Sequence, residues 1–439
     1  MFQQLSLFQT DIEQTQRCFY ENIQESGFEH QEIDIGDITF KAGQQESIHR
    51  WYRLTPSYSP ALVRYLIQQW NIKSKHFVLD PFTGRGTTSI ECQKHGIKNL
   101  GIEINPLLQQ VANKSLRWNP NYLDLFDSYF TEVSHLITKY EEESIETVVS
   151  LFKTRIPIIH NVFRWWKKEV LKNLLICREA ISASQYFPIK DYLWIALNNT
   201  CLDCANIHRN HPTITFDDNH TRQINVLDEL RKNLKIISQD LMSLTKEEMS
   251  FSELGKVQLG NATKNLKQQI NASADFVITS PPYPNRYSYI HQTRPQLYFM
   301  EVLSQVQEAT EIDLNAVGGT WGRATSILQN ELITVPSELR SYLCYYDELK
   351  DKSALMCNYA TKYFLDMWKH IKSLKTVKAE EFRGAYVVGN SRLSGVEIFT
   401  ESILGKLFRH EGFEVEKIVS FRKRGGKKRL YETAVLIRG

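Results

Sequence analysis

The stretch Asp275-Phe276-Val277-Ile278-Thr279-Ser280-Pro281-Pro282-Tyr283 decides the fold of this 439-residue chain. An apolar run rich in β-branched residues that stops at a polar residue and two prolines is typical of a buried strand at its carboxyl end. Pro281 and Pro282 are expected to hold a stiff turn with free carbonyl groups, because proline fixes φ and has no amide hydrogen. Together with the Ser280 hydroxyl and the Tyr283 ring, these carbonyls suit the exocyclic amine of a planar nucleobase. An ordinary strand followed by a Pro-Pro turn is the alternative interpretation.

A second apolar strand, Phe77-Val78-Leu79, leads into the loop Asp80-Pro81-Phe82-Thr83-Gly84-Arg85-Gly86-Thr87-Thr88. Gly84 and Gly86 permit a tight turn and a close approach of the backbone to a ligand. Residues 87–95 are then predicted to form a helix whose free amide groups face that ligand. The loop is not a phosphate loop of the Gly-x4-Gly-Lys-Ser/Thr type, because no lysine stands at the required position.

The next strand, Leu100-Gly101-Ile102, ends in Glu103-Ile104-Asn105-Pro106. An acidic side chain at the end of the second strand of a βαβ unit can accept both hydroxyl groups of an adenosine ribose. The order of strand, glycine turn, helix, strand and acid therefore predicts a cofactor that carries a nucleoside. Later in the chain, a predicted strand over 257–259 is followed by Asn261 and Ala262, which places an amide side chain where it can contact adenine.

Ser59 is expected to cap a helix that precedes the first core strand, with Pro60 at the first helical position. This order can bring the helix near the active end of that strand. A helix that merely packs against the sheet is an equally good interpretation.

The composition is that of a soluble globular protein, and the formal net charge of +3 permits a nucleic-acid partner without requiring one. No apolar signal or membrane segment is evident, and the seven cysteines are scattered, which favours a reducing cytoplasm. Cys201, Cys204, His208 and His211 have metal-binding side chains, but one straight helix cannot wrap four ligands tetrahedrally around zinc. We therefore favour a helix stripe that runs into a loop.

Residues 107–255 interrupt the βαβ pattern and are predicted to be a helical insertion. Within it, residues 163–168 and 206–212 interleave basic and aromatic side chains, as a nucleic-acid-binding surface would, although a helix with a buried Trp face has the same pattern. Residues 305–345 are expected to be rich in loops and to form a lid or a recognition loop. The strands 415–421 and 431–437 are expected to pair as an antiparallel hairpin with a basic tip at 422–429.

The two loops together resemble the signature motifs of the DNA methyltransferases that modify exocyclic amines, and Ser-Pro-Pro-Tyr resembles the N4-cytosine branch. The resemblance covers about 50–106 and 255–439 and implies an α/β, Rossmann-like methyltransferase fold with a mostly parallel seven-stranded sheet, a C-terminal antiparallel hairpin and a large helical insertion. The expected organisation is an N-terminal arm (1–48), core segments (49–106, 256–304 and 359–439), the helical insertion (107–255), possibly for DNA recognition, and a variable region (305–358).

By this resemblance, S-adenosylmethionine is the cofactor, double-stranded DNA is the substrate, and a separate restriction endonuclease is a possible partner. The expected catalytic residues are Ser280, Pro281, Pro282 and Tyr283. The expected cofactor-binding residues are Ser59, Pro60, Asp80, Pro81, Phe82, Thr83, Gly84, Gly86, Thr87, Thr88, Glu103, Ile104, Asn105, Asn261, Ala262 and Ser280.

Three alternatives stay open at this point: N6-adenine methylation, methylation of an RNA amine, and a DNA-binding relative without catalysis. A dehydrogenase shares the glycine loop and the acid, but it gives no reason for Ser-Pro-Pro-Tyr at the end of a later strand.

Overall fold

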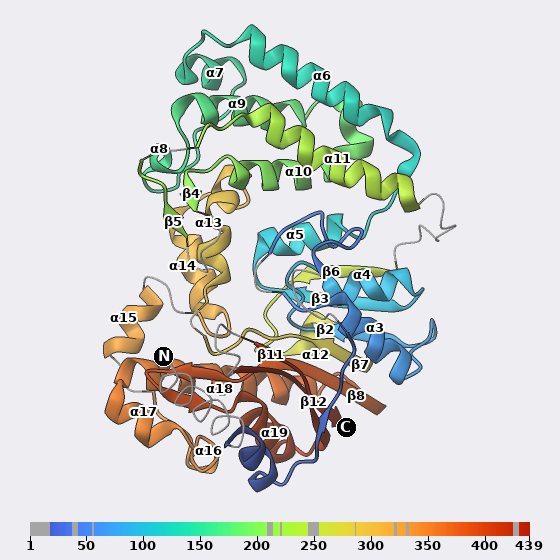
Figure 1. Cartoon of the computed structure of the whole chain (residues 1–439), viewed down its shortest axis with the longest axis vertical. Coiled ribbons are helices and arrows are strands. Elements are labelled where there is room, and N and C mark those ends of the chain that lie inside the picture. Colours follow the sequence, from blue (N-terminus) through green and yellow to red (C-terminus); the bar gives the residue numbers. More distant parts are fainter. Residues whose placement is uncertain are drawn as a thin grey trace, which may run out of the picture.

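A sheet of eight strands forms the centre of the molecule, in the order β1-β11-β12-β8-β7-β2-β3-β6 (Figure 1). This computed structural model describes residues 18–36, 43–54, 57–208, 214–219, 222–244, 254–285, 287–319, 323–330, 333–424 and 430–439. Neighbouring strands are parallel except where β12 pairs with β8 and with β11. The strands are β1 (His30–Glu32), β2 (Phe77–Asp80), β3 (Lys98–Glu103), β6 (Gly255–Leu259), β7 (Ala274–Thr279), β8 (Lys378–Gly389), β11 (Glu414–Arg424) and β12 (Leu430–Arg438).

All six strands that the sequence analysis places along the chain are present, and the antiparallel pairing of β11 with β12 is confirmed. The eighth strand, β1, comes from the N-terminal arm and was not predicted, because His-Gln-Glu has no apolar alternation. It pairs in parallel with β11, at the edge of the sheet. The basic tip of the predicted hairpin lies mostly outside the described residues. A separate small hairpin joins β9 (Ser391–Leu393) and β10 (Val396–Ile398).

Helices cover both faces of the sheet because its strands are apolar on both faces. Along β7, Phe276 and Ile278 pack with α3, whereas Val277 between them packs with α18 on the opposite face. The helix predicted after Ser59 is confirmed, since the Ser59 side chain accepts from the amide of Ala61 and caps α3. The helices near the sheet are α3 (Pro60–Gln69), α4 (Thr87–Lys94), α5 (Pro106–Lys114), α12 (Leu266–Gln269), α18 (Ala354–Leu374) and α19 (Thr400–His410).

A group of helices lies together at the end of the molecule above α5, where the sequence predicts a helical insertion (Figure 1). They share one apolar core with α5 and with α13 (Tyr289–Phe299). Trp165 and Trp166 are buried in this core, and the stretch 163–168 runs from α8 through the extended residue Trp166 to the start of α9. The elements are η1 (Pro120–Tyr122), α6 (Asp124–Lys139), α7 (Ile145–Leu151), α8 (Val162–Trp165), α9 (Lys168–Ala180), η2 (Ser184–Ile189), α10 (Lys190–Asp203), β4 (Ile207–His208), β5 (Thr215–Phe216) and α11 (Val226–Leu244).

The expectation that residues 305–345 are rich in loops is wrong for much of the segment. Glu308 and Gln305 form a reciprocal capping box at the start of α14, a signal that outweighs the nearby glycines. Residues 320–322, in the Gly-rich part, lie outside the described residues. The helices of this region are α14 (Val306–Asn315), α15 (Arg323–Asn330), α16 (Ser337–Arg340) and α17 (Tyr346–Lys352).

The cysteine and histidine cluster begins in the core of the helical region. Cys201 and Cys204 are buried, His208 is exposed, and His211 lies outside the described residues. Within the described part of the chain, no three histidine, cysteine or acidic side chains are grouped as metal ligands would be. No helix that the structure describes is both long and apolar enough to cross a membrane.

Candidate active site

The two predicted motifs meet where β2 and β7 end side by side. The chain runs outward from β2 through β3 to β6 and then returns to place β7 on the other side of β2. Such a reversal of strand order is the position at which open α/β sheets bind ligands. The Thr279 hydroxyl donates to Asp80 Oδ1 over 2.6 Å and so joins the two motifs directly.

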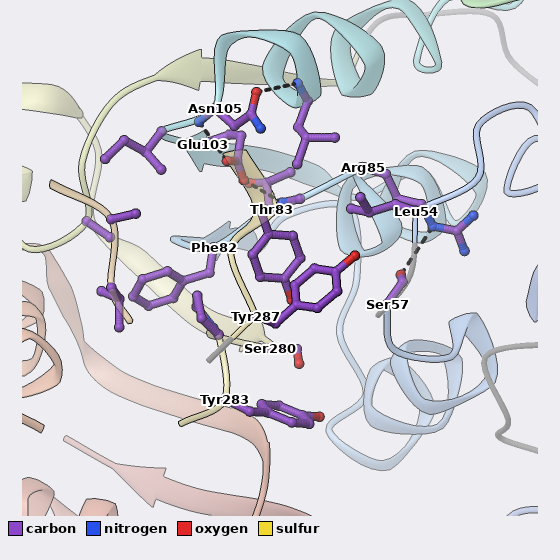
Figure 2. Close-up of a pocket in the computed structure, with 18 of the residues that line it drawn as sticks. Leu54, Ser57, Phe82, Thr83, Arg85, Glu103, Asn105, Ser280, Tyr283 and Tyr287 are labelled. Carbon is purple, nitrogen blue, oxygen red and sulfur yellow. Dashed lines mark hydrogen bonds between the residues drawn. The ribbon is translucent and has the colours of Figure 1, made fainter. Parts of the chain in front are cut away.

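A pocket opens above this junction and brings together thirteen of the predicted residues (Figure 2). Glu103 and Asn105 lie at one side of it, and Ser280 and Tyr283 lie at the other. The predicted residues that line the pocket are Pro81, Phe82, Thr83, Gly84, Thr87, Glu103, Ile104, Asn105, Asn261, Ala262, Ser280, Pro282 and Tyr283.

The other predicted residues support the pocket without lining it: Ser59, Pro60, Asp80, Gly86, Thr88 and Pro281. Thr88 Oγ1 donates to the carbonyl of Ile278 over 3.0 Å and ties α4 to β7. Gly86 has a φ of 96°, and a Cβ there would lie 3.1 Å from the Cβ of Ala112, so glycine lets α4 approach α5.

Glu103 is buried at the end of β3, and its two oxygens accept from the amides of Gly84 (2.7 Å) and Asn105 (2.8 Å). Burial raises the pKa of Glu103 to about 7, although the backbone hydrogen bonds oppose this shift. A carboxylate offers about four acceptor positions, so Glu103 retains capacity for hydroxyl donors in the pocket.

Asp80 lies beneath the pocket, where it organises the glycine loop. Its Oδ1 accepts from the amide of Phe82 over 3.1 Å as well as from Thr279. Burial raises the pKa of Asp80 to about 6. Asp80 therefore fixes the shape of the loop.

Ser280 and Tyr283 present an acceptor and a ring on the other side of the pocket. Ser280 Oγ lies 3.0 Å from the carbonyl oxygen of Val387. Because a carbonyl can only accept, the hydroxyl must donate its single hydrogen there, and its lone pairs are left to accept. Among the described residues, no hydrogen bond reaches the carbonyl of Pro281.

The sequence analysis missed three parts of the pocket wall. Leu54, Ser57 and Tyr58 come from the segment before α3, Tyr287 and Tyr289 follow the catalytic turn, and residues 313–319 close the side next to Asn261. One signal for the last part was Gly319, because a Cβ there would lie 1.7 Å from the carbonyl oxygen of Asp313. Arg85, inside the glycine loop, also lines the pocket.

The wall at 313–319 is joined to the predicted residue Asn261 and to Ser288, in the segment after the Ser-Pro-Pro-Tyr turn. The side-chain amide of Asn261 donates to the carbonyl of Asn315 over 3.1 Å, and its oxygen accepts from the amide of Thr263. The Ser288 hydroxyl donates to Asp313 over 2.6 Å. Asn261 thus positions the loop beside it, and its own polar atoms are engaged by the protein.

An open, mostly parallel sheet with one antiparallel strand, a glycine loop and an acid at the switch point are together typical of the S-adenosylmethionine-dependent methyltransferases. A family model described as "DNA methylase", for N6 and N4 enzymes, matches residues 8–114. Residues 8–114 are thus similar to this family of amino-methyltransferases, and the family implies S-adenosylmethionine as the cofactor.

Curated relatives match over most of the chain. Type II methyltransferase M.AvaI from a Nostoc species is 25% identical over 430 residues, covering 89% of this chain and 84% of that protein. Type II methyltransferase M.MvaI from Kocuria varians is 22% identical over 401 residues, covering 88% and 86%. Among solved structures, TrmN from Thermus thermophilus aligns with 8% identity and a TM-score of 0.31, covering 89% of this chain and 51% of that one.

The pocket residues fit this cofactor. Gly84, at a φ of 56°, has no side chain, and a Cβ there would lie 3.8 Å from Leu54 Cδ2, in the space that both residues line. Phe82 and Ile104 give apolar walls for a flat base, and Glu103 gives acceptors for a ribose. These apolar walls and carboxylate acceptors therefore suit an adenosine that extends along the glycine loop.

Proposed function

We propose that this protein methylates the exocyclic N4 amine of cytosine in double-stranded DNA, as the modification enzyme of a restriction-modification system. The curated relatives are named as type II methyltransferases, which supports this setting. The cytosine assignment is supported by Ser280 at the first position of Ser-Pro-Pro-Tyr. A partner endonuclease and a cytoplasmic location stay predictions.

The observation that carries the proposal is the forced acceptor role of Ser280. The lone pair of a cytosine N4 amine is delocalised into the ring, so the amine is a poor nucleophile. Hydrogen bonds from its two N–H groups to Ser280 Oγ and to the Pro281 carbonyl would draw the nitrogen towards a tetrahedral shape and free that lone pair. Orientation and local dipoles then favour direct in-line attack.

Glu103 would hold the ribose of the cofactor, and the loop 80–88 would surround its methionine part. When bound, S-adenosylmethionine supplies an electrophilic methyl group on its sulfonium. Residues 313–319 and Asn261 would shield the adenine from water, since they line that side of the pocket.

The target base must leave the duplex before it reaches Ser280, at a cost of roughly a few kcal/mol. Stacking on Tyr283 would recover about 1–3 kcal/mol of this cost. Tyr287 and Tyr289, whose ring centroids lie 5.0 Å apart, extend the aromatic wall beside it. The helical region above the pocket is the candidate for recognition of the DNA sequence.

A C5-cytosine mechanism lacks support. It would need a reactive cysteine next to a proline, and no cysteine in this sequence follows a proline. Cys92 is near the glycine loop, but it is fully buried in α4, and burial raises the pKa of its thiol.

The test is to incubate duplex DNA with the purified protein and methyl-labelled S-adenosylmethionine, and to identify the labelled nucleoside by mass spectrometry. N4-methylcytosine is expected. Labelled N6-methyladenine would instead establish the runner-up, since the same pocket can serve either amine. Label transferred only to RNA, or cofactor binding without transfer to any nucleic acid, would contradict the proposal.

A further inference from the structure

Arg85 is a buried cation beside the cofactor pocket. Its side chain is 3% exposed, and no carboxylate among the described residues lies within ion-pair distance of it. Glu46, whose charge acts on Arg85, is itself paired with Arg64 over 2.7 Å. A buried charge without a close counter-charge is costly, so its retention at a pocket calls for an explanation.

The guanidinium group is held by hydrogen bonds to one neighbouring segment. Its Nη1 donates to the carbonyls of His49 and Tyr52, and its Nε donates to Ser57 Oγ over 3.2 Å. Its Nη2 is buried and has no hydrogen-bond partner. The positive charge is therefore fixed in place immediately behind Ser57, which lines the pocket.

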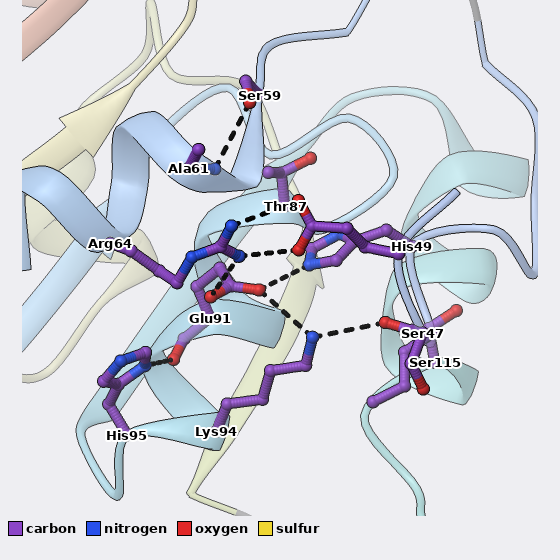
Figure 3. A network of polar contacts seen from close by, with 12 residues as sticks. Ser47, His49, Ser59, Ala61, Arg64, Thr87, Glu91, Lys94, His95 and Ser115 are labelled. Atoms are coloured by element: carbon purple, nitrogen blue, oxygen red, sulfur yellow. Dashed lines mark hydrogen bonds and ion pairs between the residues drawn. The ribbon is translucent and has the colours of Figure 1, made fainter. Parts of the chain in front are cut away.

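The two carbonyl acceptors of Arg85 belong to a segment that we call the N-terminal strap, residues 46–54, which is anchored on two sides. On one side His49 Nε2 lies 2.6 Å from Glu91, and Lys94 Nζ donates to the carbonyl of Ser47 (Figure 3). On the other side Asp240 of α11 accepts from the amide of Ile48 and from the indole of Trp51, each over 2.9 Å. The carbonyls that hold Arg85 are thus set by the fold.

The hydroxyl groups next to Arg85 are oriented as a consequence. Because Arg85 Nε donates to it, Ser57 Oγ keeps its own hydrogen for donation, and its acceptor in this structure is the carbonyl of Tyr58 at 3.5 Å, a long contact that a better acceptor can replace. Thr87 Oγ1 lies 3.4 Å from Ser57 Oγ, at the start of α4, and also lines the pocket. Glu103 lies on a different side of the pocket from Ser57 and Arg85 (Figure 2).

We propose that Arg85 is a positioning residue that makes the Ser57 and Thr87 end of the pocket a subsite for the α-carboxylate of S-adenosylmethionine. The pocket then has an acceptor end at Glu103 for the ribose hydroxyls and a cationic end for the carboxylate, and this polarity sets the direction in which the cofactor lies. The inference rests on the assignment of S-adenosylmethionine as the cofactor.

The test compares calorimetric affinities for S-adenosylmethionine and for its decarboxylated form, which has the same adenosine, sulfonium and amine but no carboxylate. The wild-type protein is expected to prefer the carboxylated ligand roughly 10- to 100-fold. Arg85→Met should reduce this preference to within about 3-fold, mainly through weaker binding of the carboxylated ligand. Arg85→Lys, which keeps the charge, should retain most of the preference for the carboxylated ligand. Ser57→Ala should lose part of this preference.

Arg64→Met is the matched control, because Arg64 also tethers the strap, through Glu46, but does not contact Ser57. Arg64→Met should lower the affinity for both ligands by the same factor and leave the preference for the carboxylated ligand unchanged. Equal weakening of both ligands by Arg85→Met would show that Arg85 only holds the strap and would overturn the proposal. A wild-type protein without any preference would also overturn it, whereas failure to bind either ligand would refute the cofactor assignment instead. Thermal unfolding curves identify variants that do not fold. If Arg85→Met does not fold, the ligand preference of Ser57→Ala replaces it as the test, and an unchanged preference in that variant would overturn the proposal.

Discussion

The loops after β2 and after β7 lie side by side, yet they are organised by different means. In the first, a buried carboxylate shapes the turn, since Asp80 accepts from Phe82 and Thr279, and Thr83 Oγ1 donates back to the Asp80 carbonyl. In the second, two consecutive prolines fix the backbone covalently. The first loop should therefore respond to pH and to lost hydrogen bonds, whereas the second should tolerate loss of its reactive side chains without losing shape.

The largest expected effect is in the second loop. Ser280→Ala and Tyr283→Ala should each lower the rate of methyl transfer by roughly 100-fold, because they remove an acceptor for the amine and a stacking surface for the base. Cofactor affinity, measured by calorimetry, should stay within about 3-fold of wild type. Wild-type transfer rates in either variant would refute the catalytic assignment, and a collapse of cofactor affinity would refute the contrast between the loops.

The next effect concerns Glu103, whose pKa of about 7 lies above its ordinary value of 4.5. Ribose hydroxyls donate to the ionised carboxylate, so cofactor affinity should rise about 10-fold or more between pH 5.5 and 8 and approach a plateau above about pH 7. Calorimetry across this range measures the rise. Glu103→Gln should bind weakly with little pH dependence, and the same rise in that variant would assign it to another group.

The same pKa has an opposite consequence for the ligand-free protein. A carboxyl whose pKa is raised on folding stabilises the fold fully below pH 4.5, and this contribution is lost as the pH rises towards 7. Thermal unfolding without cofactor should show wild-type stability falling relative to Glu103→Gln over that window, by up to about 3 kcal/mol. A flat difference would mean that Glu103 is ionised throughout.

A smaller effect is expected where the loops are joined. Thr279→Val keeps the shape of the side chain but removes the donor to Asp80, and should lower the free energy of unfolding by about 1–2 kcal/mol. Denaturant titration measures this loss. Since the Thr279 bond holds the Asp80 pKa down, the loss should be greatest above about pH 6, where the carboxylate is charged. An unchanged stability at pH 8 would show that the two loops are independent.

The smallest effect is predicted for Asn261. Its side chain is engaged by Asn315 and Thr263, so Asn261→Ala should act only through the position of the loop and weaken cofactor binding by about 3-fold. Direct binding of adenine by this side chain would give a larger loss. Comparison of binding by S-adenosylmethionine and by free methionine would separate the two cases, because only the former carries adenine.

The sequence was sufficient for the parts of the site that lie within one short stretch. The glycine loop, Glu103 and the Ser-Pro-Pro-Tyr turn each combine a strand end with residues of restricted backbone, and all three line the pocket. Walls built by distant segments were not predictable in this way. Leu54 and residues 313–319 reach the pocket through tertiary packing, and Arg85 gains its role from the carbonyls of the strap, which no local pattern reveals.

The two differences in the fold have different causes. β1 is only three residues long and all three are polar, so it forms a strand because it pairs with β11. The helices α14 to α17 are short and lie near Gly318, Gly319 and Pro336, which in isolation favour turns. In β1, packing against β11 overruled the local propensity, whereas in α14 a local capping box outweighed the glycines.

The parallel pairing of β1 with β11 has a consequence for biosynthesis. His30 and Ser420, whose side chains lie 2.9 Å apart, are separated by 390 residues. At about 5–20 residues per second, a ribosome needs about 20 to 80 s to make the second after the first. For that time Phe19, Ile23 and Phe28, which are buried in the finished protein, have no partner strands to cover them. Residues 19–28 can thus reach their final place only after β11 has been made.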